Sequence, residues 1–133
     1  MHYICKMEFK LETRMKTKTT VIVKLAVDGM HNFPMAAELF PEVAFLADRH
    51  RHTFHFTAAK QVFHDDRDVE FIMFKRDIIN YLHDQYSDNY RRTLEFGSKS
   101  CEMLAREILE RFNCEWVEVW EDNENGARVE INE

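Results

Sequence analysis

The chain has 133 residues, 45% of them apolar, and a formal net charge of −6; the length predicts one domain, and the acidic balance lacks the basic field of a protein that binds nucleic acid or anionic membranes. No apolar run approaches the roughly 20 residues that cross a bilayer, and the first residues lack the pattern of a secretory signal. Cys5, Cys101 and Cys114 show no C-x-x-C spacing, so we expect reduced thiols in a cytoplasmic protein.

Residues 1–14 alternate only weakly between apolar and polar side chains and then become basic. We treat them as an N-terminal extension of uncertain structure and assign the domain to residues 15–133. The domain predicts the element order ββααββ. Its strands are expected at 19–27, 50–63, 116–121 and 127–131, and its helices at 72–86 and 101–112.

The strand segments are rich in β-branched and aromatic residues, and the first ends at the turn pair Asp28-Gly29. Residues 30–48 contain two prolines and residues 87–98 are polar, so both segments predict loops. The helical segments carry apolar residues at three- and four-residue steps, and Ser100 can cap the second helix. Two hairpins with two helices between them predict an α+β fold, in which a four-stranded antiparallel sheet carries both helices on one face.

The strongest chemical signal in the sequence is the pair His50 and His52. In a strand, alternate side chains share a face, so these two imidazoles lie about 7 Å apart on the apolar face that continues with Phe54 and Phe56. Catalytic zinc usually takes three protein ligands and keeps a fourth position open; His31, after the first predicted strand, is the candidate third ligand. The alternative is that these are ordinary strand histidines, which when buried need a carboxylate partner.

A second cluster of candidate residues gathers around Glu121. This residue shares its predicted strand face with Val117 and Val119, so a carboxylate ends an apolar stripe. A buried acid of this kind can accept two N–H groups from a flat heterocycle. Ser100 and Cys101, at a predicted helix N-terminus, can add backbone donors to the same ligand. The plainer interpretations are a solvated strand end and an ordinary helix cap.

Together these motifs resemble the family of 6-pyruvoyl-tetrahydropterin and 6-carboxytetrahydropterin synthases, over about residues 19–131. His50-Arg51-His52-Thr53-Phe54 resembles the family's His-Gly-His segment, and His31 falls where its first zinc histidine lies. Ser100-Cys101-Glu102-Met103-Leu104-Ala105 is similar to the family's Thr-Ser-Glu-x-Leu-Ala helix start. Val119-Trp120-Glu121 is similar to the strand whose glutamate anchors the pterin ring.

The resemblance implies the tunnelling fold, in which subunits assemble into a homo-hexamer, a dimer of trimers, with sheets that close into barrels and sites at subunit interfaces. It implies a zinc ion bound by His31, His50 and His52. It also implies a pocket for a pterin or purine-like small molecule, with Glu121, Ser100 and Cys101 as substrate-binding residues. The implied activity is that of a zinc-dependent lyase acting on a substrate like dihydroneopterin triphosphate.

Two departures distinguish this chain from the family pattern. The family's proton-transferring cysteine, a few residues before the H-x-H pair, has no counterpart in residues 45–49; Asp48 is a candidate substitute, whereas His55 points away from the zinc face by alternation. The family's catalytic Asp-His pair has only His83-Asp84 nearby, earlier in the chain and on the predicted helix. The alternative function is therefore a catalytically silent zinc protein that binds a pterin or purine-like ligand. A cupin-like metal barrel is a third interpretation, which the two helices disfavour.

Overall fold

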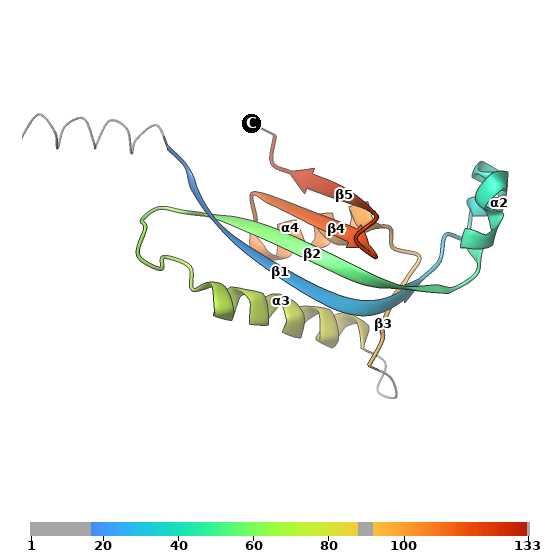
Figure 1. Cartoon of the computed structure of the whole chain (residues 1–133), viewed down its shortest axis with the longest axis horizontal. Helices are drawn as coiled ribbons and strands as arrows, with labels where there is room; N and C mark the ends of the chain where they lie inside the picture. The colour runs from blue at the N-terminus through green and yellow to red at the C-terminus, as the bar shows by residue number, and fades with distance from the viewer. Residues whose placement is uncertain (1–16, 88–91, 133) are drawn as a thin grey trace, which may run out of the picture.

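The structure is a computed structural model that describes residues 17–87 and 92–132; the expected extension at residues 1–14 lies outside the described residues. The described chain alternates strands with helices, and both long helices follow the first hairpin (Figure 1). In chain order the elements are β1 (Thr19–His31), α2 (Ala36–Leu39), the 3₁₀ segment η1 (Pro41–Ala47), β2 (His50–Val62), α3 (Phe71–Tyr86), β3 (Leu94–Gly97), α4 (Cys101–Phe112), β4 (Trp116–Glu121) and β5 (Asn125–Glu130).

The sheet has five strands in the order β3-β1-β2-β4-β5. The four predicted strands form an antiparallel run, β1-β2-β4-β5, as expected for this α+β fold. The prediction of a four-stranded antiparallel sheet was nevertheless short by one strand, because β3 pairs with β1 in parallel and makes the sheet mixed. This strand is only four residues long and lies in the segment predicted as a loop; Leu94 and Phe96 bury their side chains in the core, but two apolar residues are too few for a periodic signal.

Strand β1 continues beyond the turn predicted at Asp28-Gly29 and ends only at His31. The turn prediction was wrong because Gly29 is paired on both sides, with His52 of β2 and with Leu94 of β3. A glycine inside a strand often marks the close approach of another group. Here the rings of Phe54 and Phe96 occupy the space that a side chain at residue 29 would need, with ring centroids 4.9 Å apart.

The connection between β1 and β2 is not the irregular loop that its two prolines predict. It contains the short helix α2 and the 3₁₀ segment η1, which is kinked at Val43. Both lie beyond the end of the β1–β2 hairpin, away from the two long helices (Figure 1). Pro41 opens η1, at a helix start where a missing N–H group removes no intrahelical bond.

Helices α3 and α4 cover one face of the sheet, as predicted, and their apolar stripes meet the inward side chains of the strands in a single core. Helix α3 packs on β1 and β3, whereas α4 packs on β4 and β5. Ser100 caps α4 as predicted, since its hydroxyl accepts a hydrogen bond from the N–H of Met103 at 3.2 Å. Among the described residues, no helix combines the length and apolar content needed to span a membrane.

The close packing at Gly29 predicts that even one added methyl group is destabilising. An ideal Cβ at this position would lie 2.7 Å from Cδ2 of Phe96 and 2.8 Å from Cδ2 of Phe54. We expect Gly29→Ala to lower the free energy of unfolding by about 1–3 kcal/mol, the usual cost of overpacking a core. Urea denaturation measures the free energy of unfolding. The control Ala26→Ser, on the exposed face of the same strand, should change this free energy by less than about 0.5 kcal/mol. Equal midpoints for the two variants would contradict the packing argument.

Candidate metal centre

Three imidazoles converge at the end of the first hairpin. His31 and His50 are directly paired in the β1–β2 ladder, and His52 lies two residues further along β2 on the same face. The ring centroids are 4.6 Å apart for His31 and His50, 4.9 Å for His50 and His52, and 5.3 Å for His31 and His52. One ligand atom from each residue lies within 4.8 Å of the others. The convergence predicted from the H-x-H spacing is therefore confirmed.

The three rings are oriented by hydrogen bonds at their Nδ1 atoms. Each Nδ1 faces an oxygen that can only accept, so each ring in its neutral form carries its proton there and turns the Nε2 lone pair toward the other two rings. This outer partner is what metal-binding histidines commonly have. The bonds join His31 to the carbonyl of Lys99 (3.0 Å), His50 to the carbonyl of Asp48 (2.8 Å) and His52 to Oδ2 of Asp122 (2.7 Å).

One coordinating atom has no hydrogen-bond partner among the described residues. Nε2 of His52 is buried, and although Oε2 of Glu121 lies 3.3 Å away, the two atoms do not form a hydrogen bond. A buried nitrogen without a partner is costly, and a bound cation would satisfy it. Three imidazole donors are a ligand set that zinc and related transition metals favour. The residues present therefore fit a metal ion, and zinc is the identity that we propose for it.

Glu121 ties the site together electrostatically. Its Oε1 lies 3.2 Å from Nε2 of His31, and this hydrogen bond is the main reason why the pKa of Glu121 is lowered. Burial alone would lower the pKa of His31, but the hydrogen bond and charge of Glu121, together with the Lys99 carbonyl, raise it overall. Glu121 thus favours the protonated form of His31, and a metal ion would compete with a proton for this ring.

The predicted substrate-binding residues meet the histidines in one cavity of about 510 Å³. Ser100, Cys101 and Glu121 line it together with His31 and His50, so the structure brings the two clusters found in the sequence to the same place. The size is that of a pocket for a single small molecule. Its apolar walls come from Phe33, Phe40, Leu46 and Met103.

Cys101 is a neutral thiol in this cavity. Its Sγ lies 3.5 Å from Oε1 of Glu121 and donates to it. Burial, followed by the negative charge of Glu121, raises the pKa of Cys101 to about 12. At neutral pH this residue therefore provides a weak hydrogen-bond donor and not the thiolate that would act as a nucleophile or base.

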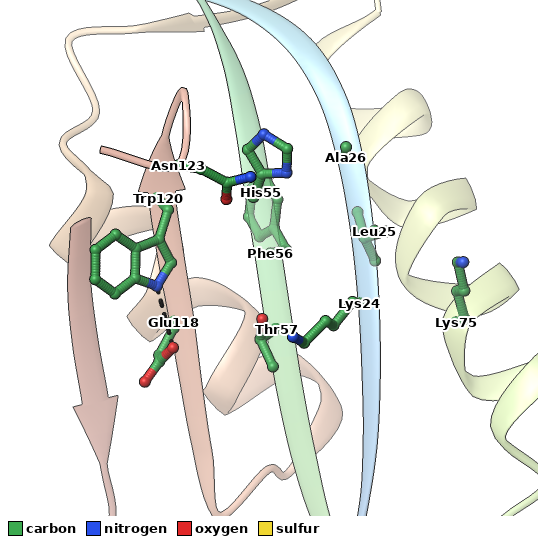
Figure 2. Close-up of a pocket in the computed structure, with 10 residues that line it drawn as sticks. All are labelled: Lys24, Leu25, Ala26, His55, Phe56, Thr57, Lys75, Glu118, Trp120 and Asn123. Atoms are coloured by element: carbon green, nitrogen blue, oxygen red, sulfur yellow. Dashed lines mark hydrogen bonds between the residues drawn. The ribbon is translucent and has the colours of Figure 1, made fainter. Parts of the chain in front are cut away.

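Two other candidates lie away from the cavity. His83 and Asp84 are exposed on α3 and are not among the residues that line it, so their catalytic role stays a prediction without a contact to the histidines. His55 lies on the opposite face of β2, as alternation predicts, and lines a separate cavity beside Trp120 and Asn123 (Figure 2). It does not line the cavity that holds His31 and His50.

Asp122 is a residue of the site that the sequence analysis missed. It lies in the β4–β5 turn with a left-handed backbone (φ 54°), where it also accepts the N–H of Thr53 at 2.9 Å. The hydrogen bond from His52, followed by that from Thr53, lowers its pKa, so it is an ionised partner for the ring. An acidic turn residue is common in any sequence, and the only available signal was its position directly after Glu121.

Removing one of the three imidazoles should weaken metal binding strongly, because zinc then loses one of its three nitrogen ligands. We expect the unaltered protein to bind about one zinc per chain and His50→Ala to bind far less. His55→Ala, on the opposite face of the same strand, should keep the metal. Elemental analysis after dialysis against zinc gives the stoichiometry. Equal zinc contents for His50→Ala and the unaltered chain, or no zinc bound by the unaltered chain, would rule out this centre.

The bond from Asp122 to His52 predicts a smaller effect on the same metal. Asp122→Asn keeps the size of the side chain but removes its charge, which orients and polarises the ring. We expect about 10–100-fold weaker zinc binding in a competition titration with a chromophoric chelator. Asp28→Asn is the matched control, because Asp28 pairs with Arg51 on the far face of the sheet. Equal zinc affinities for the two variants would show that Asp122 does not support the centre.

Comparison with known proteins adds no assignment: no family model matches the chain, and no curated protein matches it. The resemblance to tetrahydropterin synthases thus depends on the motifs themselves, above all on His31, His50 and His52. What the structure adds is that the three side chains converge, and that Glu121 lines one cavity together with His31 and His50.

Proposed function

We propose that the protein is a zinc-dependent enzyme of the tetrahydropterin synthase type, a lyase that acts on a pterin like dihydroneopterin triphosphate. The observation that carries this proposal is that Glu121 lines the same cavity as His31 and His50, and that its carboxylate lies 3.2 Å from Nε2 of His31 and 3.3 Å from Nε2 of His52. A metal-binding group and an ionised acid in one small pocket can both contact the same ligand. In this proposal the chain adopts the tunnelling fold and assembles into a homo-hexamer.

In this proposal, the three histidines and the residues around Glu121 contact different parts of the substrate. When zinc is bound, it supplies a Lewis acid that favours ionisation of the substrate's side-chain oxygens. The bonds at the Nδ1 atoms hold the three rings in orientation, and the rings would in turn hold the metal in a fixed position. Glu121 accepts the paired N–H groups of the heterocycle, and Ser100 and Cys101, at the start of α4, face the same ligand.

The alternative is a zinc-containing protein that binds a pterin or purine-like ligand without transforming it. Specific observations favour this alternative: residues 45–49 contain no thiol, and the buried Cys101 has a pKa of about 12. Asp48 is exposed just before β2, and its backbone carbonyl is hydrogen-bonded to His50. A pocket without a matched base binds but does not move protons.

Incubating the zinc-loaded protein with dihydroneopterin triphosphate tests both functions. The enzyme converts the substrate to a tetrahydropterin product, detected by mass spectrometry, whereas the silent protein shows only a rise in Tm. His50→Ala is the control and should show neither effect. If zinc binds but neither product nor a change in Tm is observed, the pterin proposal is wrong for both functions.

A further inference from the structure

Two carboxylates contact the ring of His52, and they do so on opposite sides. Asp122 meets Nδ1, the outer nitrogen, whereas Glu121 meets Nε2, the nitrogen that faces the other imidazoles. Glu121 also meets Nε2 of His31 with its other oxygen. Glu121 therefore lies on the coordinating side of two rings, where a partner that only orients a ligand would not lie.

The distances match those between neighbouring ligands of one zinc ion. Bonds of about 2.0–2.1 Å in a tetrahedral site put neighbouring ligand atoms roughly 3.4 Å apart. Oε1 of Glu121 is 3.2 Å from Nε2 of His31, and Oε2 is 3.3 Å from Nε2 of His52. The carboxylate is thus spaced from two of the rings as a fourth ligand would be.

We propose that Glu121 is the fourth zinc ligand of the resting protein, so that an incoming substrate must displace it before its own oxygens reach the metal. The inference rests on the metal centre of the proposed function and adds a step to substrate binding. Once released from the metal, the carboxylate can accept hydrogen bonds from the N–H groups of the substrate's heterocycle. Ligand exchange at the metal and recognition of the substrate's heterocycle are then coupled through the side chain of Glu121.

The surroundings of Glu121 allow such a movement. Its side chain is 26% exposed and lies at the end of β4, next to the β4–β5 turn. Apart from the two histidines, its side chain bonds only to the weak donor Cys101 among the described residues. Asp122, in contrast, is held by both Thr53 and His52. Of the two carboxylates, Glu121 is the one that can leave.

Competition at a cobalt-substituted site tests the inference. Cobalt(II) takes the same ligands as zinc and absorbs visible light, so a bound external ligand changes its spectrum. Acetohydroxamate, which binds metals through two oxygens, serves as the probe. It must displace Glu121 in the unaltered protein, so we expect at least about ten-fold tighter binding to Glu121→Gln and Glu121→Ala. Glu118→Gln, from the opposite face of β4, should bind the probe as the unaltered protein does.

The outcomes separate this inference from the metal centre itself. Equal acetohydroxamate affinities for the unaltered protein and both Glu121 variants, each with an intact cobalt spectrum, overturn the fourth ligand and leave the three-histidine centre standing. A chain that takes up no cobalt overturns both. Circular dichroism shows whether each variant is folded, and using two variants separates loss of the carboxylate from a new contact made by the amide of Gln.

Discussion

The register of the β1–β2 ladder is the constraint on which the site depends. His31 stands directly opposite His50, and His52 follows on the same face. Because side chains alternate in a strand, a shift of one residue in either strand would turn one set of imidazoles to the opposite face of the sheet. The register is fixed by the apolar side chains further along both strands, which must all face the two helices. The hydrophobic core therefore sets the geometry of the three candidate metal ligands.

The orientation of the rings depends on parts of the chain far from the hairpin. Lys99 precedes α4, Asp48 ends the connection from η1, and Asp122 lies in the β4–β5 turn. Each supplies one acceptor for one ring, so three separate segments must be in position before the Nε2 atoms converge. The site is thus formed by tertiary structure, although its ligands come from a single hairpin.

The sequence could predict features whose signals are local and periodic. The face shared by His50, His52 and Phe54 follows from alternation in one strand, and the limits of α4 follow from Ser100 and the apolar stripe after it. Alternation along the same strand places Glu121 on the face of Val117 and Val119, which the structure shows to be the face toward the core. These signals need no knowledge of distant parts of the chain.

Other features depend on partners that no local pattern reveals. Strand β3 exists because Leu94 and Phe96 find a place beside β1, and Asp28-Gly29 continues a strand because the chain on both sides pairs with it. In the sequence, Asp122 has no feature that distinguishes it from other acidic turn residues, and only the folded chain places it beside His52. Whether His83 and Asp84 take part in catalysis could not be derived from a pair of residue types at a helix end.

The glycine within β1 also determines what lies beneath the metal centre. With no side chain at Gly29, the rings of Phe54 and Phe96 close together under the imidazoles, and Phe54 lies 5.0 Å from the ring of His31. A hydrocarbon floor excludes water and screens charge poorly. The positive charge of a divalent cation bound there would have to be balanced from the open side, where Glu121 supplies a carboxylate.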